Sequence, residues 1–515
     1  MESHCEGPLR SPYDATMRPL ALITTLITLL ASPAFAFTCP AEGGSEWREY
    51  KTAHFLLDTD VSRFRAEILL KDLEQLRALV VQGLFGEQVE VPGRMRVLVP
   101  GSFGHYEDLA GSRTRSAFFK TTGWGDALIV MPIEGRQADR ELVAHEVAHY
   151  LSHYQFPEQP SWFAEGLAHF FQTVASAGRT NDPATGSHVI RGASTLGGGV
   201  GLLSDQLVLQ FGSDRRPLRA KELLEWTGEE REDSPARYHA WSWILYHWLW
   251  SERSAQFANY QKRLADGEAP NDAWIAAFPE FDPARPATLE KLDDELMRYE
   301  RVRRYVFYKV SAQSTSTYVD TPLSSADVHL LLAHGRYDVG PAGLARQRAD
   351  LDAAVREDAL SAQALYEREL FDRKMPAVEK VRAIANARPT DPRAWSVLAE
   401  VTTDRAERTK DFRKAAQLNP EDARIQMQLA RALLDEGGFA EALSAANRAV
   451  DLAPWHPAMI ETLASVAAAL GKCPEALKLG KRADRIFSDW YHDRSTQAHE
   501  RYLQLEERCR KNTRR

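Results

Sequence analysis

The sequence predicts an α+β domain followed by an all-α domain of helical repeats. Up to about residue 310, short β-type apolar segments alternate with amphipathic helical ones. Beyond residue 324 the pattern is almost entirely helical and repetitive. At 515 residues the chain is also too long for a single hydrophobic core. We therefore expect a domain over residues 37–310, a linker over 311–323 and a repeat domain over 324–515.

Composition and charge narrow the class of protein. The 44% apolar and 26% charged residues are typical of a soluble globular protein. The chain has 64 Lys and Arg against 72 Asp and Glu, a net charge of -8, which argues against nucleic-acid binding. The basic run at 301–304 follows a mixed-charge helical segment, so we interpret it as solvated surface and not as a polyanion site.

The N-terminus has the pattern of an export signal. Arg18 precedes an apolar run over 20–31, and Ala34-Phe35-Ala36 predicts cleavage after Ala36. Residues 1–36 would then be removed, with Met17 as a possible true start. The alternative is an uncleaved membrane anchor. We expect a periplasmic or secreted protein with no stable membrane insertion once the signal is cleaved.

The first domain is expected to alternate strands and helices. In chain order we expect a strand over 47–58, a helix over 62–82, a strand over 94–99, a helix over 102–109 and a strand over 127–131. Ser102 is the expected cap of the short helix. The aromatic segment 238–250 should form a helix that faces the core.

A metal-binding pattern follows the last of these strands. In His145-Glu146-Val147-Ala148-His149, a helix places both histidines on one face, where they can bind one ion. Zinc sites with two histidines on one helix need a third ligand, and Glu165 is our candidate. Fifteen residues separate Glu165 from His149, enough for a turn at 156–160 and a second helix capped by Ser161.

The HExxH pattern followed by Pro-x-Trp-x-x-Glu-Gly-Leu-Ala resembles the peptidase MA-like, or gluzincin, superfamily. More narrowly, it resembles exported bacterial members that carry TPR repeats. The resemblance implies a zincin-like fold and a Zn²⁺ held by His145, His149 and Glu165. Glu146 would act as general base in the hydrolysis of a peptide or protein substrate.

The same resemblance implies roles for other residues. Tyr238 is a candidate donor to the oxyanion, with His239 as the second candidate. His169 stands where several gluzincins have an acidic residue that orients a zinc ligand, so it is either a departure from that pattern or an exposed polar residue. His153 is a weaker candidate ligand than Glu165. The strand 127–131 resembles the edge strand to which a peptide could pair, although a purely structural strand is as plausible.

Glycine-rich stretches at 178–187 and 197–201 are expected to form a mobile loop near the cleft. A phosphate-binding loop is rejected because no strand, turn and helix with a lysine follows these glycines.

The repeats and the cysteines characterise the C-terminal half. Leu418-Asn-Pro-Glu-Asp-Ala423 and Leu452-Ala-Pro-Trp-His-Pro457 are 34 residues apart, the period of tetratricopeptide (TPR) repeats. We expect four or five stacked hairpins whose concave surface binds a protein partner. Cys473 and Cys509 are a plausible disulfide pair, which leaves Cys39 unpaired.

Two functions from different classes remain. The first is an exported zinc metallopeptidase whose repeats bind a partner or substrate. The second is a catalytically inactive or weak peptidase-like scaffold that acts in protein–protein interaction through its repeats. A chance HExxH in a structural helix is a third interpretation, although the Trp-x-x-Glu-Gly-Leu-Ala segment would then be a second coincidence.

Overall fold

The computed structural model of the protein describes most of the chain after residue 43. The described residues are 44–513 apart from 87–89, 92, 112–116, 122–126, 133–136, 157, 176–178, 182–187, 191–196, 204–206, 208–216, 228–234, 304, 338–339 and 491–494. The expected export signal and Cys39 therefore lie outside the described residues. No helix of the described residues is long and apolar enough to cross a membrane.

A six-stranded sheet forms the centre of the α+β part. Its strands are, in spatial order, β10 (Val319–Pro322), β1 (Arg48–Lys51), β2 (Phe55–Thr59), β3 (Met95–Val99), β5 (Ala127–Val130) and β4 (Phe118–Thr121). The central strands β2, β3 and β5 are parallel and the outer pairs are antiparallel. Buried apolar side chains such as Leu57, Val97 and Ile129 explain why these segments form strands.

The stretch 311–323, expected as a linker, contains the edge strand β10. Arg48 pairs with Pro322 and Lys51 with Val319, so the chain returns to the sheet before the repeats begin.

The proposed edge position of β5 is wrong. β5 pairs with β3 on one side and with β4 on the other, where Phe118 lies opposite Val130. Its backbone donors and acceptors are therefore engaged on both sides, and a peptide could not pair with it.

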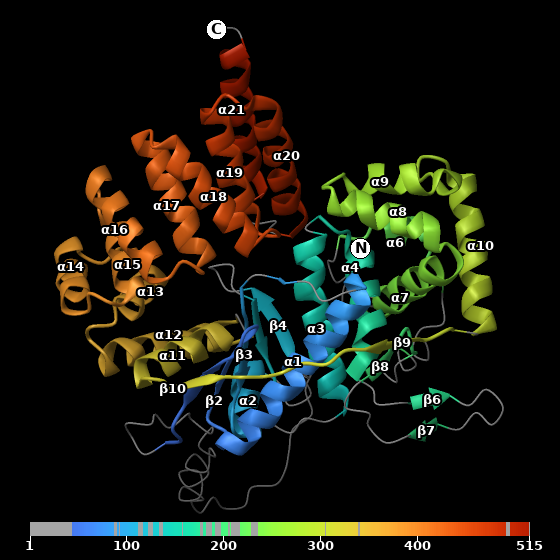
Figure 1. Ribbon diagram of the computed structural model, residues 1–515, viewed down its shortest axis with the longest axis horizontal. Helices are drawn as coiled ribbons and strands as arrows, with labels where there is room; N and C mark the ends of the chain where they lie inside the picture. The colour runs from blue at the N-terminus through green and yellow to red at the C-terminus, as the bar shows by residue number, and fades with distance from the viewer. Residues whose placement is uncertain are drawn as a thin grey trace, which may run out of the picture. The chain divides into compact units, whose positions relative to one another are not determined.

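Helices pack against the sheet, and two of them carry the predicted metal ligands (Figure 1). The helix α1 (Arg63–Phe85) packs against β2 and against α3 (Gln137–Gln155), and α3 also contacts β5. The short helix α2 (Phe103–Ala110) begins at Ser102, whose side chain accepts a hydrogen bond from the His105 backbone N–H, as predicted. The helix α4 (Ser161–Gln172) follows α3 after a short turn.

The remaining elements of this part are mostly helices. They are η2 (Thr173–Ala175), β6 (Arg179–Asn181), β7 (His188–Ile190), β8 (Gly197–Val200), α6 (Ala220–Leu224), α7 (Pro235–Glu252), α8 (Ser254–Ala265), α9 (Pro270–Ala277), η3 (Pro279–Phe281), α10 (Pro286–Val302) and β9 (Tyr308–Ser311). The expected mobile loop is in part a strand, because β8 pairs with β9. The aromatic helix α7 is confirmed as a core element, since Trp241, Ile244, Leu245 and Trp248 are all buried.

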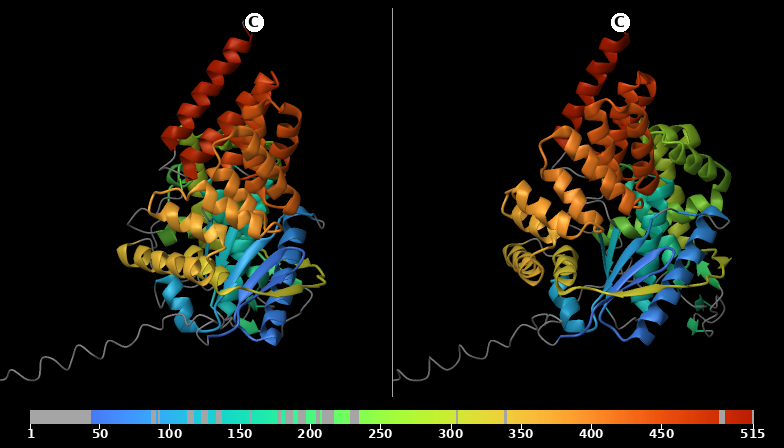
Figure 2. Two further views of the ribbon diagram at one scale, coloured as in Figure 1. Left: turned by 90° about the vertical axis from the view of Figure 1, so that its left-hand side faces the viewer. Right: turned by 60° about the vertical axis from the view of Figure 1, so that its left-hand side comes forward.

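The C-terminal half consists of stacked helical hairpins, as the period predicted (Figures 1 and 2). The pairs are α11 (Ser325–Gly335) with α12 (Pro341–Glu357), α13 (Ala362–Phe371) with α14 (Val378–Ala387), α15 (Pro392–Val401) with α16 (Arg405–Leu418), α17 (Ala423–Glu436) with α18 (Phe439–Leu452), and α19 (Pro457–Ala469) with α20 (Cys473–Trp490). Small and apolar side chains, among them Ala399, Ala415 and Leu429, form a shared core between neighbouring hairpins. Each hairpin thus buries its apolar face against the next one.

A last helix, α21 (Ser495–Thr513), packs against α20. Cys473 at the start of α20 and Cys509 near the end of α21 form a disulfide, so the candidate pair is confirmed.

Candidate metal centre and repeat pocket

Two adjacent helices position the predicted metal ligands. His145 and His149 lie one turn apart on α3, and Glu165 projects from the second turn of α4. Gly166 allows α7 to approach α4 closely, because a Cβ atom there would lie 2.5 Å from the carbonyl oxygen of Ser242. This close contact also brings His239, in the second turn of α7, beside Glu165.

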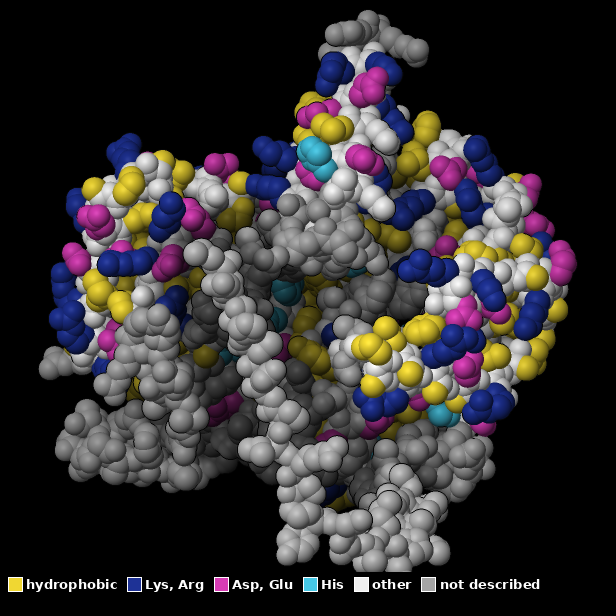
Figure 3. Space-filling view, turned by 180° about the vertical axis from the view of Figure 1, so that it is seen from behind, with side chains coloured by type: hydrophobic (Ala, Val, Ile, Leu, Met, Phe, Trp, Pro, Cys, Tyr) yellow, Lys and Arg dark blue, Asp and Glu magenta, His cyan; other side chains and the backbone are white. Residues whose placement is uncertain are grey.

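The structure brings the three predicted ligands together. The Nε2 atoms of His145 and His149 are 3.0 Å apart. The Glu165 carboxylate lies 3.5 Å from His145 Nε2 through Oε2 and 3.4 Å from His149 Nε2 through Oε1. All three side chains are largely buried. A hollow on the face opposite to that in Figure 1 has histidine side chains at its bottom (Figure 3).

Two further histidines belong to the same cluster. His239 Nδ1 lies 3.1 Å from Glu165 Oε2, and His169 Nε2 lies 3.9 Å from the same oxygen. The two rings also meet, with 3.2 Å between His169 Nε2 and His239 Nδ1. His169 is 2% exposed, so its interpretation as an exposed polar residue is wrong.

Burial and the charges of neighbouring side chains shift the pKa values of residues in this cluster. Burial alone would raise the pKa of Glu165, but the neighbouring histidines hold it well below its usual value. Burial lowers the pKa of His169 well below the usual value, so its ring is neutral. Burial raises the pKa of Glu146, which lies beside His145 and His149. Burial alone would lower the pKa of His149, but the Glu165 carboxylate raises it above its usual value. A cation bound by these side chains would take the place of that proton.

The buried Glu165 carboxylate beside these histidine nitrogens is compatible with a bound metal ion. Glu165 Oε2 and His145 Nδ1 are both buried and have no hydrogen-bond partner. Glu165 Oε2 lies 3.1 Å from His239 Nδ1 and 3.5 Å from His145 Nε2, and a cation among these atoms would stabilise the buried carboxylate further. A second possible ligand set consists of His145, Glu165 and His169, whose ligand atoms lie within 4.8 Å of one another. It shares His145 and Glu165 with the predicted set.

Tyr238 and His153 lie at the margin of the cluster. Tyr238 is buried, with its ring 5.1 Å from that of Trp226 and near the Arg237 guanidinium, whereas its neighbour His239 contacts Glu165. His153 stacks on His149 with 6.2 Å between ring centroids, and its Nδ1 lies 3.0 Å from the side-chain nitrogen of Gln159. Burial lowers the pKa of His153 to about 3. The sequence pattern did not assign His169 or His239 as ligands, because neither stands at a characteristic spacing.

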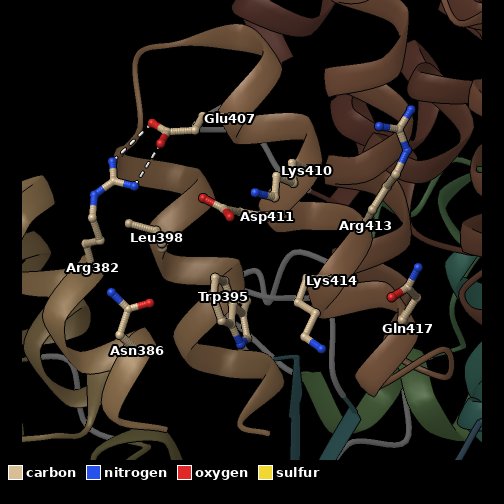
Figure 4. A pocket seen from close by; sticks show the side chains of 10 residues that line it. All are labelled: Arg382, Asn386, Trp395, Leu398, Glu407, Lys410, Asp411, Arg413, Lys414 and Gln417. Atoms are coloured by element: carbon tan, nitrogen blue, oxygen red, sulfur yellow. Dashed lines mark hydrogen bonds and ion pairs between the residues drawn. The ribbon is translucent and has the colours of Figure 1, made fainter. Parts of the chain in front are cut away.

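A second candidate site lies on the repeats. A pocket of about 540 Å³ opens between α14 and α16 and reaches α15 (Figure 4). Trp395 and Leu398 of α15 lie between the two helices, and Arg382 binds both carboxylate oxygens of Glu407, at 2.9 and 3.0 Å. No sequence motif marked this pocket, since its residues come from three helices.

More cationic than anionic side chains line this pocket. Four cationic side chains and two carboxylates line the pocket. Arg382 forms an ion pair with Glu407, and Arg413 forms one with Glu441 outside the pocket lining. Lys410 and Lys414 are exposed and make no ion pair within the described part of the chain. Burial and the nearby Glu407 raise the pKa of Asp411 to about 6, and its Oδ2 is buried without a hydrogen bond. The pocket therefore combines an indole ring with a positive rim.

Comparisons with known proteins found similar solved structures among TPR repeat proteins. Neither models of protein families nor curated proteins match the sequence. Among solved structures, TTC0263 of Thermus thermophilus, a thermophilic TPR protein, is 18% identical over 35% of this chain and 98% of its own, with a TM-score of 0.27. YrrB, a TPR protein with an unusual peptide-binding site, is 20% identical over 36% of this chain and 89% of its own, with a TM-score of 0.25. Yeast Tom70 is 12% identical over 59% of this chain and 70% of its own, with a TM-score of 0.27.

These comparisons overturn the predicted family. The similar structures are TPR proteins and not gluzincin peptidases, so the predictions of a hydrolase, a metalloprotease and an HExxH zinc peptidase are wrong. The physical reason is that HExxH and a downstream Glu specify only a cluster of ligands on two helices. Peptide hydrolysis also needs an open metal position and an oxyanion donor. Here His169 and His239 also lie near Glu165, and the Tyr238 ring lies beside Trp226 and Arg237. The cluster of ligands alone therefore does not identify a peptidase.

Proposed function

We propose that this protein is an interaction scaffold whose repeats bind an acidic segment of a protein partner. The single observation that carries this proposal is the pocket between α14 and α16. Its two exposed lysines form no ion pair within the described residues, and Trp395 offers an apolar surface beside them. An extended segment rich in Asp or Glu complements both features.

The experiment measures fluorescence anisotropy of two labelled twelve-residue peptides, one of Glu and Ala and one of Lys and Ala. We expect the acidic peptide to bind the full mature chain and the basic peptide not to bind. Raising the salt concentration should weaken binding, because the attraction is between exposed charges. The double substitution Lys410→Glu and Lys414→Glu should weaken it at least tenfold.

A matched control separates the pocket from net charge. Lys478→Glu with Lys481→Glu makes the same charge change on exposed positions of α20. This control should bind the acidic peptide as the wild type does. If both double variants lose binding equally, or if neither peptide binds, the pocket is not the docking site.

We further propose that His145, His149 and Glu165 hold one Zn²⁺ ion. The burial of the Glu165 carboxylate and the short distances between the ligand atoms support this ligand set. A bound ion would fix α3 and α4 to each other and would compensate the buried carboxylate. Metal analysis of the purified protein beside Glu165→Ala and His149→Ala tests the site. Equal zinc content in all three proteins would contradict it.

Export is the third part of the proposal. The apolar run over 20–31 and the Ala34-Phe35-Ala36 step support cleavage after Ala36. The Cys473–Cys509 disulfide is in keeping with an oxidising compartment such as the periplasm. Mass spectrometry of the protein isolated from the periplasmic fraction should find Phe37 as its first residue. An intact N-terminus in the cytoplasmic fraction would exclude export.

A further inference from the structure

We infer that the acidic segment carries a neutral hydroxyl or amide side chain that donates a hydrogen bond to Asp411, inside the pocket between α14 and α16. This inference rests on the proposed function and goes beyond it, because it names the class of residue that sets the register of the segment. Acidic residues on either side of that donor would lie over Lys410 and Lys414, which line the same pocket.

Asp411 is a buried carboxylate that accepts no hydrogen bond. The residue belongs to the pocket lining and is 5% exposed, and its Oδ2 is buried without a partner. Neither of its oxygens forms an ion pair within the described part of the chain. A buried acceptor without a donor destabilises the folded protein, so such groups almost always have a partner. The structure therefore points to a ligand that supplies the donor.

Other donors of the pocket are already engaged. Trp395 Nε1 donates to a backbone carbonyl oxygen at 2.9 Å. Arg382 donates to both carboxylate oxygens of Glu407, at 2.9 and 3.0 Å (Figure 4). The indole and this guanidinium therefore do not satisfy Asp411.

The position of Asp411 favours a side chain of the segment over its backbone. Glu407 is four positions before Asp411 and Lys414 three positions after it, so the three lie on one face of α16. Figure 4 shows the carboxylate between the Arg382–Glu407 pair and Lys410. The two lysines are exposed whereas Asp411 is buried. A donor that reaches Asp411 must therefore project from the segment into the pocket.

The charges around Asp411 favour a neutral donor. Four cationic side chains line the pocket, so a lysine or arginine of the segment would meet a positive potential. A glutamate or aspartate at the same position would face the Asp411 carboxylate, and like charges repel. Serine, threonine, asparagine and glutamine carry neutral donors. The pocket therefore selects one of these residues between acidic ones.

The raised pKa of Asp411 has the same physical cause. Burial removes water from the carboxylate and no donor replaces it, and with the nearby Glu407 this raises the pKa to about 6. Asp411 is still mainly ionised at pH 7.5. An ionised carboxylate accepts a stronger hydrogen bond than a neutral oxygen does.

The test is a double-mutant cycle, measured by fluorescence anisotropy on the full mature chain at pH 7.5. Two labelled twelve-residue peptides of Glu and Ala differ at one central position, which is threonine in one and the isosteric valine in the other. We expect the wild type to bind the threonine peptide about tenfold more tightly, because the hydrogen bond has a charged acceptor. Asp411→Leu has no acceptor and should bind both peptides equally.

Two further variants complete the experiment. Asp411→Ala also lacks an acceptor and takes the place of Asp411→Leu if circular dichroism shows that the latter does not fold. Gln417→Leu removes an exposed polar side chain from the same pocket lining and should keep the preference for the threonine peptide.

The outcomes separate this inference from the proposed function. Equal binding of both peptides by the wild type, or a preference that persists in the Asp411 variants, overturns the hydrogen bond and leaves the acidic-segment site standing. A third peptide with lysine at the central position should bind more weakly than the threonine peptide. If it binds more tightly, Asp411 takes a cation and the inference is wrong. If no acidic peptide binds the wild type, the proposed function fails, and the inference fails with it.

Discussion

Gly166 shows how one missing side chain organises the metal centre. A Cβ atom at this position would lie 2.5 Å from the Ser242 carbonyl oxygen and 2.7 Å from the Tyr246 Cβ. Gly166→Ala would therefore push α7 away from α4 and should lower the free energy of unfolding by about 1–3 kcal/mol. Thermal unfolding followed by tryptophan fluorescence measures the change. Gly438→Ala is the control, because its nearest neighbour would lie at an ordinary 3.4 Å. Equal stability of both variants would mean that α4 and α7 do not pack as described.

The raised pKa of Asp411 predicts that the stability of the folded protein depends on pH. Its folded-state pKa of about 6 exceeds the ordinary value of 3.8, because burial and Glu407 outweigh Arg382 and Lys410. The folded state then holds the proton more tightly than the unfolded chain, so stability from this group falls as the pH rises from about 4 to about 6. Asp411→Asn remains neutral, and its advantage in melting temperature over the wild type should grow across this range. A constant difference from pH 4 to pH 7 would contradict the shifted pKa.

The sequence alone predicted some of the residues of the candidate metal centre. The HExxH spacing and the Trp-x-x-Glu-Gly-Leu-Ala segment identified His145, His149 and Glu165, because helical spacing alone places such residues on one face. His169, His239 and the pocket lysines could not be found in this way. Their position depends on the contact of α7 with α4 and on the stacking of three repeat helices, which are tertiary features.

Among the elements, the disulfide between α20 and α21 should determine the stability of the C-terminal helix. Cys473 and Cys509 are 36 positions apart, and closing a loop of that length stabilises the folded state by about 3–4 kcal/mol in the chain-entropy model. The double substitution Cys473→Ser and Cys509→Ser should speed amide hydrogen exchange in α21. Exchange in α15 should not change, because its main contacts are with α13, α14 and α16. Unchanged exchange in α21 would show that packing alone holds this helix.

The elements themselves were largely predictable. Apolar alternation and helical spacing identified β3, α1 and α2, and the 34-residue period identified the stacked hairpins. The pairing of the strands was harder to predict. The edge strand β10 pairs with β1 across more than half of the chain, and β4 covers β5, so neither pairing leaves a local signal.

For the whole molecule, contacts between the repeats and the α+β part are specific. Residues Thr38–Arg515 form one compact unit. Glu158, in the turn between α3 and α4, forms ion pairs with Arg482 and Arg485 of α20 and is 3% exposed. Tyr150 of α3 packs edge-on against Trp455, with ring centroids 5.4 Å apart. The last hairpin therefore supports the turn that joins the two helices of the metal centre.

Removing the buried carboxylate should weaken this contact. Glu158→Gln leaves two arginines without their partner and should lower the free energy of unfolding by about 1–3 kcal/mol. Glu421→Gln is the matched control, since Glu421 pairs with Arg94 but is 48% exposed, and such surface pairs contribute about 1 kcal/mol or less. Chemical denaturation of the three proteins compares them. A larger loss for Glu421→Gln than for Glu158→Gln would contradict the description of this contact.

The proposed function is that this chain binds acidic segments through the pocket between α14 and α16 and leaves them intact. The most direct measurement incubates the zinc-reloaded mature protein with the acidic peptide and follows binding by anisotropy and peptide length by mass spectrometry. We predict that the peptide is bound and recovered intact, and that Glu146→Gln behaves as the wild type does. Cleavage by the wild type that disappears in Glu146→Gln would contradict the claim.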